Sequence, residues 1–339
     1  MKIIVGKDPI TVGQKSIENT LNLLSNDTKI KQKITVAVSG GRDSMCLFYL
    51  CSTMRNIDLD VVSVNHNIRR KSVKENRLVE KFSNELNVKC ITKFVGERPP
   101  KNGVEEWARI KRYDILIEHC KKRNSILFLG HHLDDQIETF WLNLKRGSGV
   151  LGLAGMKKIS ERNNCKIVRP LLDISRKDIS TIVAKHKIKF IDDRMNFNRK
   201  FSRVNIRHNR NKAQRLLGIT DDRLKLCVDN LRQTADSISF FVNRLSLDFP
   251  LDLYKNSVSF PNKILSEFPQ EIILRWLAFN FQSLIGSVYP PKFEKIKRVY
   301  LDMISATKSD YFRKRTLGHC SIQLHKNIFK IQYLKNTKE

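Results

Sequence analysis

The sequence predicts an α/β fold, in which a parallel sheet carries helices on both faces, followed by a smaller, mainly helical α+β domain. Two observations predict it. Up to about residue 217, short apolar or β-branched runs alternate with stretches whose apolar residues recur at helical spacing, which is the pattern of βαβ units. Beyond that point helical stretches dominate. The 339 residues, 41% of them hydrophobic, are enough for two domains with cores of their own.

The first domain, residues 1–217, opens its sheet with Ile34–Val38, a β-branched run that ends at a serine and two glycines. A helix is expected from Asp43 to Met54, because apolar residues recur there at helical spacing. Further strands are expected at Leu59–Val64, Lys89–Phe94 and Ile126–Leu129, and further helices at Val73–Leu86, Val104–Cys120, Asp134–Leu144 and about Arg176–His186. Ligands bind at the carboxyl ends of such strands, so the segments that follow the strands are the candidate site.

The second domain is expected to cover residues 218–339. Gly218 can end one helix, and Thr220 or Asp221 can cap the next one. Helices are expected at Arg223–Leu245, Gln270–Ile285 and Phe293–Met303, and strands at Ser321–Leu324 and Ile328–Tyr333. This mixture predicts a small α+β domain.

The charge of the chain bears on its partners. Lys and Arg number 63 against 34 Asp and Glu, a formal net charge of +29. Such an excess favours a nucleic acid as partner; a lysine-rich composition without a polyanionic ligand is the alternative. No run approaches the ~20 apolar residues that span a bilayer, and the N-terminus lacks the apolar core of a signal peptide. We therefore expect a cytoplasmic protein without membrane contact.

Seven cysteines are present, and no C-x-x-C pair occurs. The odd count and this spacing argue against a disulfide framework, a zinc ribbon and an iron–sulfur cluster. Buried thiols in a reducing cytoplasm are expected instead.

The most informative hexapeptide is Ser39–Ser44 (SGGRDS), which follows a predicted strand and opens a predicted helix. Its two glycines allow a tight turn and a close approach to a ligand. The first N–H groups of the helix then favour an anion, and the two serines add hydroxyl donors. No Walker A motif occurs in the chain. The hexapeptide thus predicts a pyrophosphate pocket; a plain strand–turn–helix with a polar cap is the alternative.

A second polar segment, Gly130–Thr139 (GHHLDDQIET), also lies between a predicted strand and a predicted helix. Asp135 and Glu138 are three residues apart and share one helical face. The pair could hold an ammonium group or Mg²⁺, or could only complement the helix dipole. His131 and His132 are adjacent, so their side chains diverge, and a two-histidine metal site is disfavoured.

A third segment, from Arg194 to Arg215, is rich in Lys and Arg and contains no acid. Arg199, Arg203, Arg207 and Arg210 recur at three- and four-residue spacing, so one helical face is cationic. Contact with RNA or ATP phosphates is favoured, and a solvated surface helix is the alternative.

These segments together resemble a known family. Ser39–Ser44 resembles the PP-loop of the ATP pyrophosphatases, which cleave ATP to AMP and pyrophosphate while they adenylate a substrate. Gly130–Thr139 resembles the H-H-x-D-D-Q-x-E-T signature of the tRNA(Ile)-lysidine synthases. Further segments match that family in order over residues 32–217, namely Trp107–Tyr113, Arg146–Met156, Arg169–Leu172 and Asp193–Arg207. A weaker likeness at Tyr289–Pro291 and Arg315–Cys320, close to the end of the chain, leads us to expect the compact form without the family's last C-terminal domain.

The resemblance implies a fold like that of the adenine nucleotide alpha hydrolases and a ligase reaction. ATP with Mg²⁺ would adenylate the wobble cytidine of a tRNA(Ile) with a CAU anticodon, and L-lysine would then replace AMP to give lysidine. It implies that ATP is bound by Ser39, Gly40, Gly41, Arg42, Asp43, Ser44 and His66, with Asp43 also on the metal. Arg112 and Arg203 would stabilise charge in catalysis. Asp135 and Glu138 would hold the lysine amine, and either could act as the base. Arg199, Arg207 and Arg210 would bind substrate RNA, as would the second domain.

Three alternatives remain at this point. A 2-thiocytidine-type tRNA enzyme of the same superfamily would carry paired cysteines, which are missing. A small-molecule amidotransferase-type ligase would carry a glutaminase segment, which is missing here, and the chain is too basic for that class. A non-catalytic RNA-binding protein would not need both acidic and glycine-rich motifs intact. The sequence predicts neither the oligomeric state nor the role of Met1–Lys31.

Overall fold

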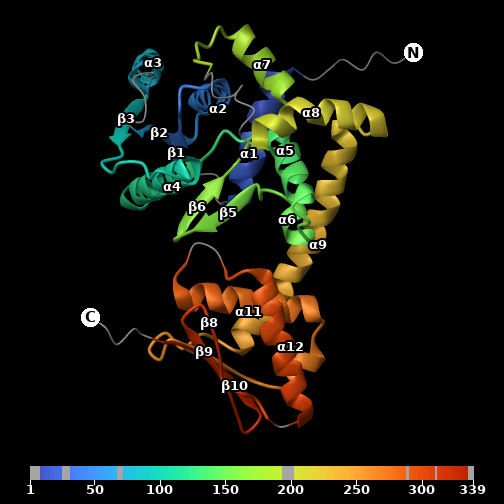
Figure 1. The fold of residues 1–339 in the computed structure, drawn as a ribbon. Coiled ribbons are helices and arrows are strands. Elements are labelled where there is room, and N and C mark those ends of the chain that lie inside the picture. Colours follow the sequence, from blue (N-terminus) through green and yellow to red (C-terminus); the bar gives the residue numbers. More distant parts are fainter. Residues whose placement is uncertain are drawn as a thin grey trace. The chain divides into compact units, whose positions relative to one another are not determined.

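The computed structural model describes residues 8–24, 31–66, 72–192, 202–287, 290–309 and 311–334. The chain divides into two compact units, Met1–Leu231 and Arg232–Glu339 (Figure 1). The division lies within the long helix α9 (Asp221–Asp248). The boundary that the sequence places at residue 218 stays a prediction.

The first unit is built on a six-stranded sheet of order β3-β2-β1-β4-β6-β5. Its strands are β1 (Gln32–Ala37), β2 (Ile57–Asn65), β3 (Lys89–Phe94), β4 (Ile126–Phe128), β5 (Ile159–Arg162) and β6 (Cys165–Val168). All neighbouring pairs are parallel except the hairpin of β5 and β6. That hairpin was not expected from the sequence, and it adds an antiparallel edge to a parallel sheet.

Helices cover both faces of this sheet, which confirms the predicted fold class. The helices of this unit up to residue 217 are α1 (Pro9–Leu24), α2 (Arg42–Ser52), α3 (Ser72–Glu85), α4 (Val104–Arg123), α5 (Leu133–Lys145), α6 (Val150–Leu153), α7 (Arg176–Lys185) and α8 (Ser202–Leu217). Successive strand residues point to opposite faces: Val61 packs in a core with α1, α2 and α7, whereas Val62 packs with α4. Both faces are therefore apolar, as a parallel sheet requires.

The chain order of the strands brings two distant loops together. From the central strand β1 the chain continues to β2 and β3 on one side, and then crosses to β4 on the other side of β1. The connections that follow β1 and β4 therefore emerge side by side at the carboxyl edge of the sheet. Ligands of open α/β sheets bind at such a switch point.

The second unit is an α+β domain of its own. Its antiparallel sheet has the order β7-β10-β9-β8. The strands are β7 (Ser257–Pro261), β8 (Arg315–Leu317), β9 (Cys320–His325) and β10 (Ile328–Tyr333), and the helices that accompany the end of α9 are α10 (Ile264–Glu267), α11 (Gln270–Ile285) and α12 (Phe293–Ser309). Trp276, Phe281 and Phe329 are fully buried in its core. In the part of the chain that the structure describes, no helix is long and apolar enough to cross a membrane.

Candidate functional site

The connection from β1 to α2 forms the predicted phosphate loop. Gly40 has a left-handed φ of 80°, and a Cβ there would press against the Glu75 backbone oxygen at 3.3 Å. The Ser44 hydroxyl accepts a hydrogen bond from the Ser39 N–H (3.2 Å) and donates one to the Gly41 carbonyl (2.9 Å). Gly41, the N-cap residue, has no side chain to cap α2. The first N–H groups of the helix are thus left for an anion.

The connection from β4 to α5 packs directly on this loop. A Cβ placed on Gly130 would lie 3.0 Å from the Asp43 carbonyl oxygen and 3.1 Å from the Ser44 Cα. Two backbones approach here so closely that a Cβ on Gly130 would force one of them to shift. The two polar segments singled out in the sequence therefore form one site.

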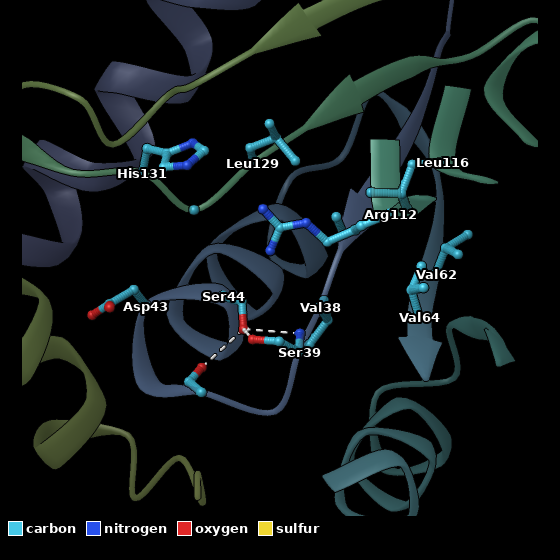
Figure 2. Close-up of a pocket in the computed structure, with 13 residues that line it drawn as sticks. Val38, Ser39, Asp43, Ser44, Val62, Val64, Arg112, Leu116, Leu129 and His131 are labelled. Carbon is cyan, nitrogen blue, oxygen red and sulfur yellow. Dashed lines mark hydrogen bonds between the residues drawn. The ribbon is translucent and has the colours of Figure 1, made fainter. Parts of the chain in front are cut away.

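A cavity of about 190 Å³ opens at this junction. Apolar side chains from three strands and from α4 form one wall, and Ser39, Ser44, Arg112 and His131 contribute polar atoms. Figure 2 shows Arg112 reaching from α4 toward the two serines, with Leu129 and Val62 beside it. An apolar wall next to a ring of donors suits a nucleotide, whose base is flat and whose phosphates are charged.

Buried His132 connects the phosphate loop to the first turn of α5. Its Nε2 lies 3.5 Å from an Asp43 carboxylate oxygen and 3.6 Å from an Asp135 oxygen. Burial would raise the pKa of Asp43, but the hydrogen bond and charge of His132, with Arg42 and Arg176, hold that pKa below its usual value. Burial favours neutral His132, yet Asp43, Asp135 and Asp134 raise its pKa. The imidazole therefore ties the carboxylates of both loops together.

The acidic residues of α5 have distinct partners. The Asp135 carboxylate accepts the backbone N–H of His132 (3.1 Å). Glu138 is 1% exposed and accepts two hydrogen bonds from Arg207, at 2.6 and 3.0 Å. Asp134 pairs with Arg210 and accepts the Arg176 backbone N–H (2.9 Å). His132 thus connects Asp135 to Asp43 of the phosphate loop, and Glu138 on the same helix pairs with Arg207. That the two acids hold the lysine amine stays a prediction.

Helix α8 is attached to α5 by charge. Arg207 and Arg210 of α8 pair with Glu138 and Asp134 of α5. Among the described side chains of α8, only that of Gln214 is buried. The described part of α8 is therefore held to α5 by ion pairs rather than by buried apolar side chains.

Gln136, which the sequence analysis left without a role, fixes the glycine-rich loop. Its side chain donates to the Met156 carbonyl (2.9 Å) and accepts the Met156 N–H (2.7 Å). Gly155 has a φ of 67°, and a Cβ there would meet the Gln136 amide at 2.7 Å. The buried amide therefore anchors residues 147–156 to the helix that carries Asp135 and Glu138. The only sign of this role in the sequence is the position of Gln136 between the carboxylates of Asp135 and Glu138.

Other predicted site residues lie elsewhere or are not described. Arg42 donates to the Ser180 hydroxyl (3.1 Å), and its guanidinium lies 5.9 Å from the Phe190 ring. The His66 ring is 6.4 Å from that of Trp107, and burial, with the charge of Arg112, lowers its pKa. Arg199 lies outside the described residues, as does the side chain of Arg203.

Within the described ranges, Asp43 is the candidate ligand for a metal ion. Among the described residues, no three His, Cys, Asp or Glu side chains are grouped so as to hold a metal ion, and all seven cysteines are free thiols. Mg²⁺ is commonly bound by one or two carboxylates together with substrate phosphates and water. The Asp43 side chain, 33% exposed beside the phosphate loop, fits that mode of binding.

Comparisons with known proteins agree with this geometry. Residues 13–213 match the PP-loop domain family. A tRNA(Ile)-lysidine synthase from Wolbachia pipientis wMel is 31% identical over 328 residues, 94% of this chain and 74% of that protein. Another, from Rickettsia bellii (strain OSU 85-389), is 37% identical over 179 residues, 52% of this chain and 41% of that protein. A solved structure, the U34-tRNA thiolase NcsA from Methanococcus maripaludis with its 4Fe-4S cluster, has a TM-score of 0.53 at 17% identity and covers 67% of this chain and 79% of its own. That likeness shows the fold alone.

Proposed function

This chain belongs to the tRNA(Ile)-lysidine synthase family of PP-loop enzymes, and from that premise we propose that it joins L-lysine to the wobble cytidine of a tRNA with a CAU anticodon. The reaction consumes ATP and releases AMP and pyrophosphate. One observation carries the proposal: the backbone contact of Gly130 with Asp43 and Ser44 joins a phosphate loop to a pair of carboxylates. A cytoplasmic location is part of the proposal.

The first step is adenylation of the base. The cytidine O2 attacks the α-phosphate of ATP, the bond to the β-phosphate oxygen breaks, and pyrophosphate leaves. Ser39, Gly41, Asp43, Ser44 and Arg112 line the cavity in which the phosphates would lie. The N–H groups at the start of α2 and the guanidinium of Arg112 would stabilise the negative charge of the transition state there. Asp43 would hold Mg²⁺, whose charge neutralises the phosphates. Arg203 is proposed to add a further cation.

In the second step the ε-amine of lysine attacks carbon 2 of the base, and AMP leaves. An ammonium group cannot attack until it loses a proton, so a carboxylate must both hold the amine and accept that proton. Asp135 and Glu138 are the proposed pair. Glu138 already holds a cation, the guanidinium of Arg207. At Glu138 the lysine amine must share the carboxylate with this guanidinium or replace it. Asp135 makes no ion pair with an arginine in the described residues, so it can bind the lysine amine directly.

The RNA is proposed to contact α8 and the segment before it. Arg207 and Arg210 are partly neutralised by Glu138 and Asp134, so a backbone phosphate competes with these carboxylates rather than meeting free cations. Arg199 stays a predicted contact outside the described residues. The target base must leave its stack to reach a cavity of this depth.

The proposal is tested by incubating the protein with ATP, labelled lysine and a CAU-anticodon tRNA, followed by nucleoside analysis. Lysidine at the wobble position, with AMP formed in equal amount, is the expected result. The matched control is the same tRNA with a uridine at that position, which should incorporate no lysine. Label in neither tRNA, or equal label in both, would overturn the proposal.

A further inference from the structure

Three arginine side chains surround one buried tyrosine beside the cavity. Tyr113 of α4 is 3% exposed. The guanidinium carbons of Arg109, Arg112 and Arg162 lie 5.2, 5.8 and 5.2 Å from the centre of its ring. Arginine stacks on aromatic rings while its N–H fork stays free to bind an oxyanion in two places. The tyrosine is thus a platform that holds three cationic forks in a small volume.

This cluster extends from the cavity to the protein surface. Arg112 lines the cavity, whereas Arg109, one helical turn earlier on α4, is exposed. Arg162 comes from β5, at the unexpected antiparallel edge of the sheet. The three residues therefore mark a path of positive charge that leads outward from the proposed reaction site along α4 and the β5–β6 hairpin.

The positive charges of Arg109 and Arg162 are only weakly compensated by carboxylates among the described residues. Arg162 has one carboxylate near it, Asp114 at 3.5 Å, and the Asp114 side chain is 48% exposed. Arg109 makes no ion pair within the described residues, although Glu105 lies one turn before it on α4. The buried Tyr113 hydroxyl likewise has no hydrogen-bond partner there. Like charges held this close repel one another unless an anion lies among them.

We propose that Arg109 and Arg162, which lie on the Tyr113 ring beside Arg112, form a binding site for a backbone phosphate of the substrate RNA, close to the nucleotide that enters the cavity. The inference rests on the proposed function for the identity of the RNA. The phosphates of ATP already have the Ser39–Ser44 loop, and Arg109 and Arg162 are absent from the lining of the cavity in the described structure. A polyanion approaching from outside meets them first, and phosphate contacts of this kind fix the register of the RNA without reading its sequence.

The test measures tRNA affinity against salt concentration for Arg109→Gln and Arg162→Gln. The affinity falls as the salt concentration rises, and each lost phosphate contact should make this dependence less steep. The slope of log affinity against log salt should decrease in magnitude by roughly 0.7 to 0.9, and binding at low salt should weaken about tenfold. Lys122→Gln is the matched control, since Lys122 is an exposed cation of the same helix that is paired with Glu118. Its slope should not change. Tyr113→Leu should reduce the salt dependence of tRNA binding as the arginine variants do. Tyr113→Phe, which keeps the aromatic ring, should reduce it less.

An unchanged slope in both arginine variants would overturn the site. So would an unchanged slope with a weaker affinity for ATP or pyrophosphate, since the cluster would then serve the nucleotide. Lysine incorporation by the unaltered protein is scored separately. Lysine incorporation by the unaltered protein together with an unchanged slope in both arginine variants overturns the arginine site alone. A reduced slope in a protein that incorporates no lysine supports the site and overturns the proposed activity.

Discussion

The Arg207 guanidinium donates two hydrogen bonds to the Glu138 carboxylate, although the residues are 69 positions apart in the sequence. The carboxylate is buried, and the guanidinium is about one quarter exposed. Hydrogen bonding to Glu138 is the largest cause of the raised pKa of Arg207. Glu138, which is proposed to bind the lysine substrate, therefore also stabilises the fold through its pair with Arg207. Substitutions can separate these two roles.

Removing one partner of this pair should destabilise the protein more than removing both. Arg207→Met leaves Glu138 buried and uncompensated, so we expect the free energy of unfolding in urea to fall by about 3 kcal/mol. The double variant Glu138→Gln with Arg207→Met should recover more than half of that loss. Arg215→Met, on the exposed face of the same helix, is the control and should change stability by less than about 0.5 kcal/mol. Equal losses in the single and double variants would contradict the pairing.

Asp135→Asn should separate the two chemical steps. The asparagine oxygen can still accept the His132 N–H, so the variant removes the charge while keeping the cap. We expect lysine transfer to fall about 100-fold, in the range of a lost general base, and tRNA-dependent release of pyrophosphate to fall less than about tenfold. Glu138→Gln should show the same asymmetry. If both steps fall equally, the assignment of the lysine site is wrong.

Gly130→Ala should weaken ATP binding through the backbone alone. The added methyl meets the Asp43 carbonyl at 3.0 Å, so the phosphate loop must shift away from the connection after β4. We expect the KM for ATP to rise at least tenfold, as about 1.4 kcal/mol of lost binding would give. Gly96→Ala is the matched control, because a Cβ there meets nothing within 4 Å. A normal KM in Gly130→Ala would show that the two loops can separate without harm.

Gln136→Leu should loosen the glycine-rich loop. It removes two hydrogen bonds and leaves the Met156 N–H and carbonyl without these partners, so a loss of about 2 to 3 kcal/mol in unfolding free energy is expected. Faster proteolysis within residues 147–156 should accompany it. Gln14→Leu is the control, because it removes a single hydrogen bond to Thr53 that is exposed to solvent. The free energy of unfolding should fall by less than about 1 kcal/mol in this variant. Unchanged proteolysis would mean that other contacts hold the loop.

Thiol reagents should find one cysteine first. Cys227 is exposed, whereas Cys46 is buried and burial raises its pKa to about 12. Because the thiolate is the reactive form, iodoacetamide at pH 8 should label Cys227 well before the other thiols, as read by peptide mass spectrometry. Cys227→Ser should remove the fast phase of labelling and keep activity. Early labelling of Cys46 would contradict the burial of α2.

Much of the first unit was predictable because its signals are local. The strands near Ile34 and Leu59 are apolar, β-branched runs, and their helices carry apolar residues at regular spacing. The hairpin of β5 and β6 escaped prediction because Ile159–Arg162 holds one apolar residue and gains its partner only across a turn at Asn163 and Asn164. The strands β7 and β8 also escaped prediction, because they have only five and three residues.

The candidate site was predictable in its residues and not in its contacts. The acids and the glycines stand out in the sequence, and the fold brings both segments together as expected. The partners of those residues do not stand out. Nothing local in the chain indicates that Arg207 meets Glu138, or that Gln136 holds the Met156 backbone, since such pairs depend on how α8 and the glycine-rich loop pack on α5.

The adjacency of β1 and β4 has a consequence for the order in which the chain matures. The hydroxyls of Thr35 and Ser125, which are 90 positions apart in the sequence, form a hydrogen bond. Contacts between such distant segments form slowly because a long loop must close first. Until β4 pairs with β1, the residues after β4 that line the cavity, Leu129, Gly130 and His131, are not in place. Bound nucleotide is therefore a reporter of completed folding, and ATP stabilises the finished domain while leaving earlier, partly assembled chains exposed to proteases.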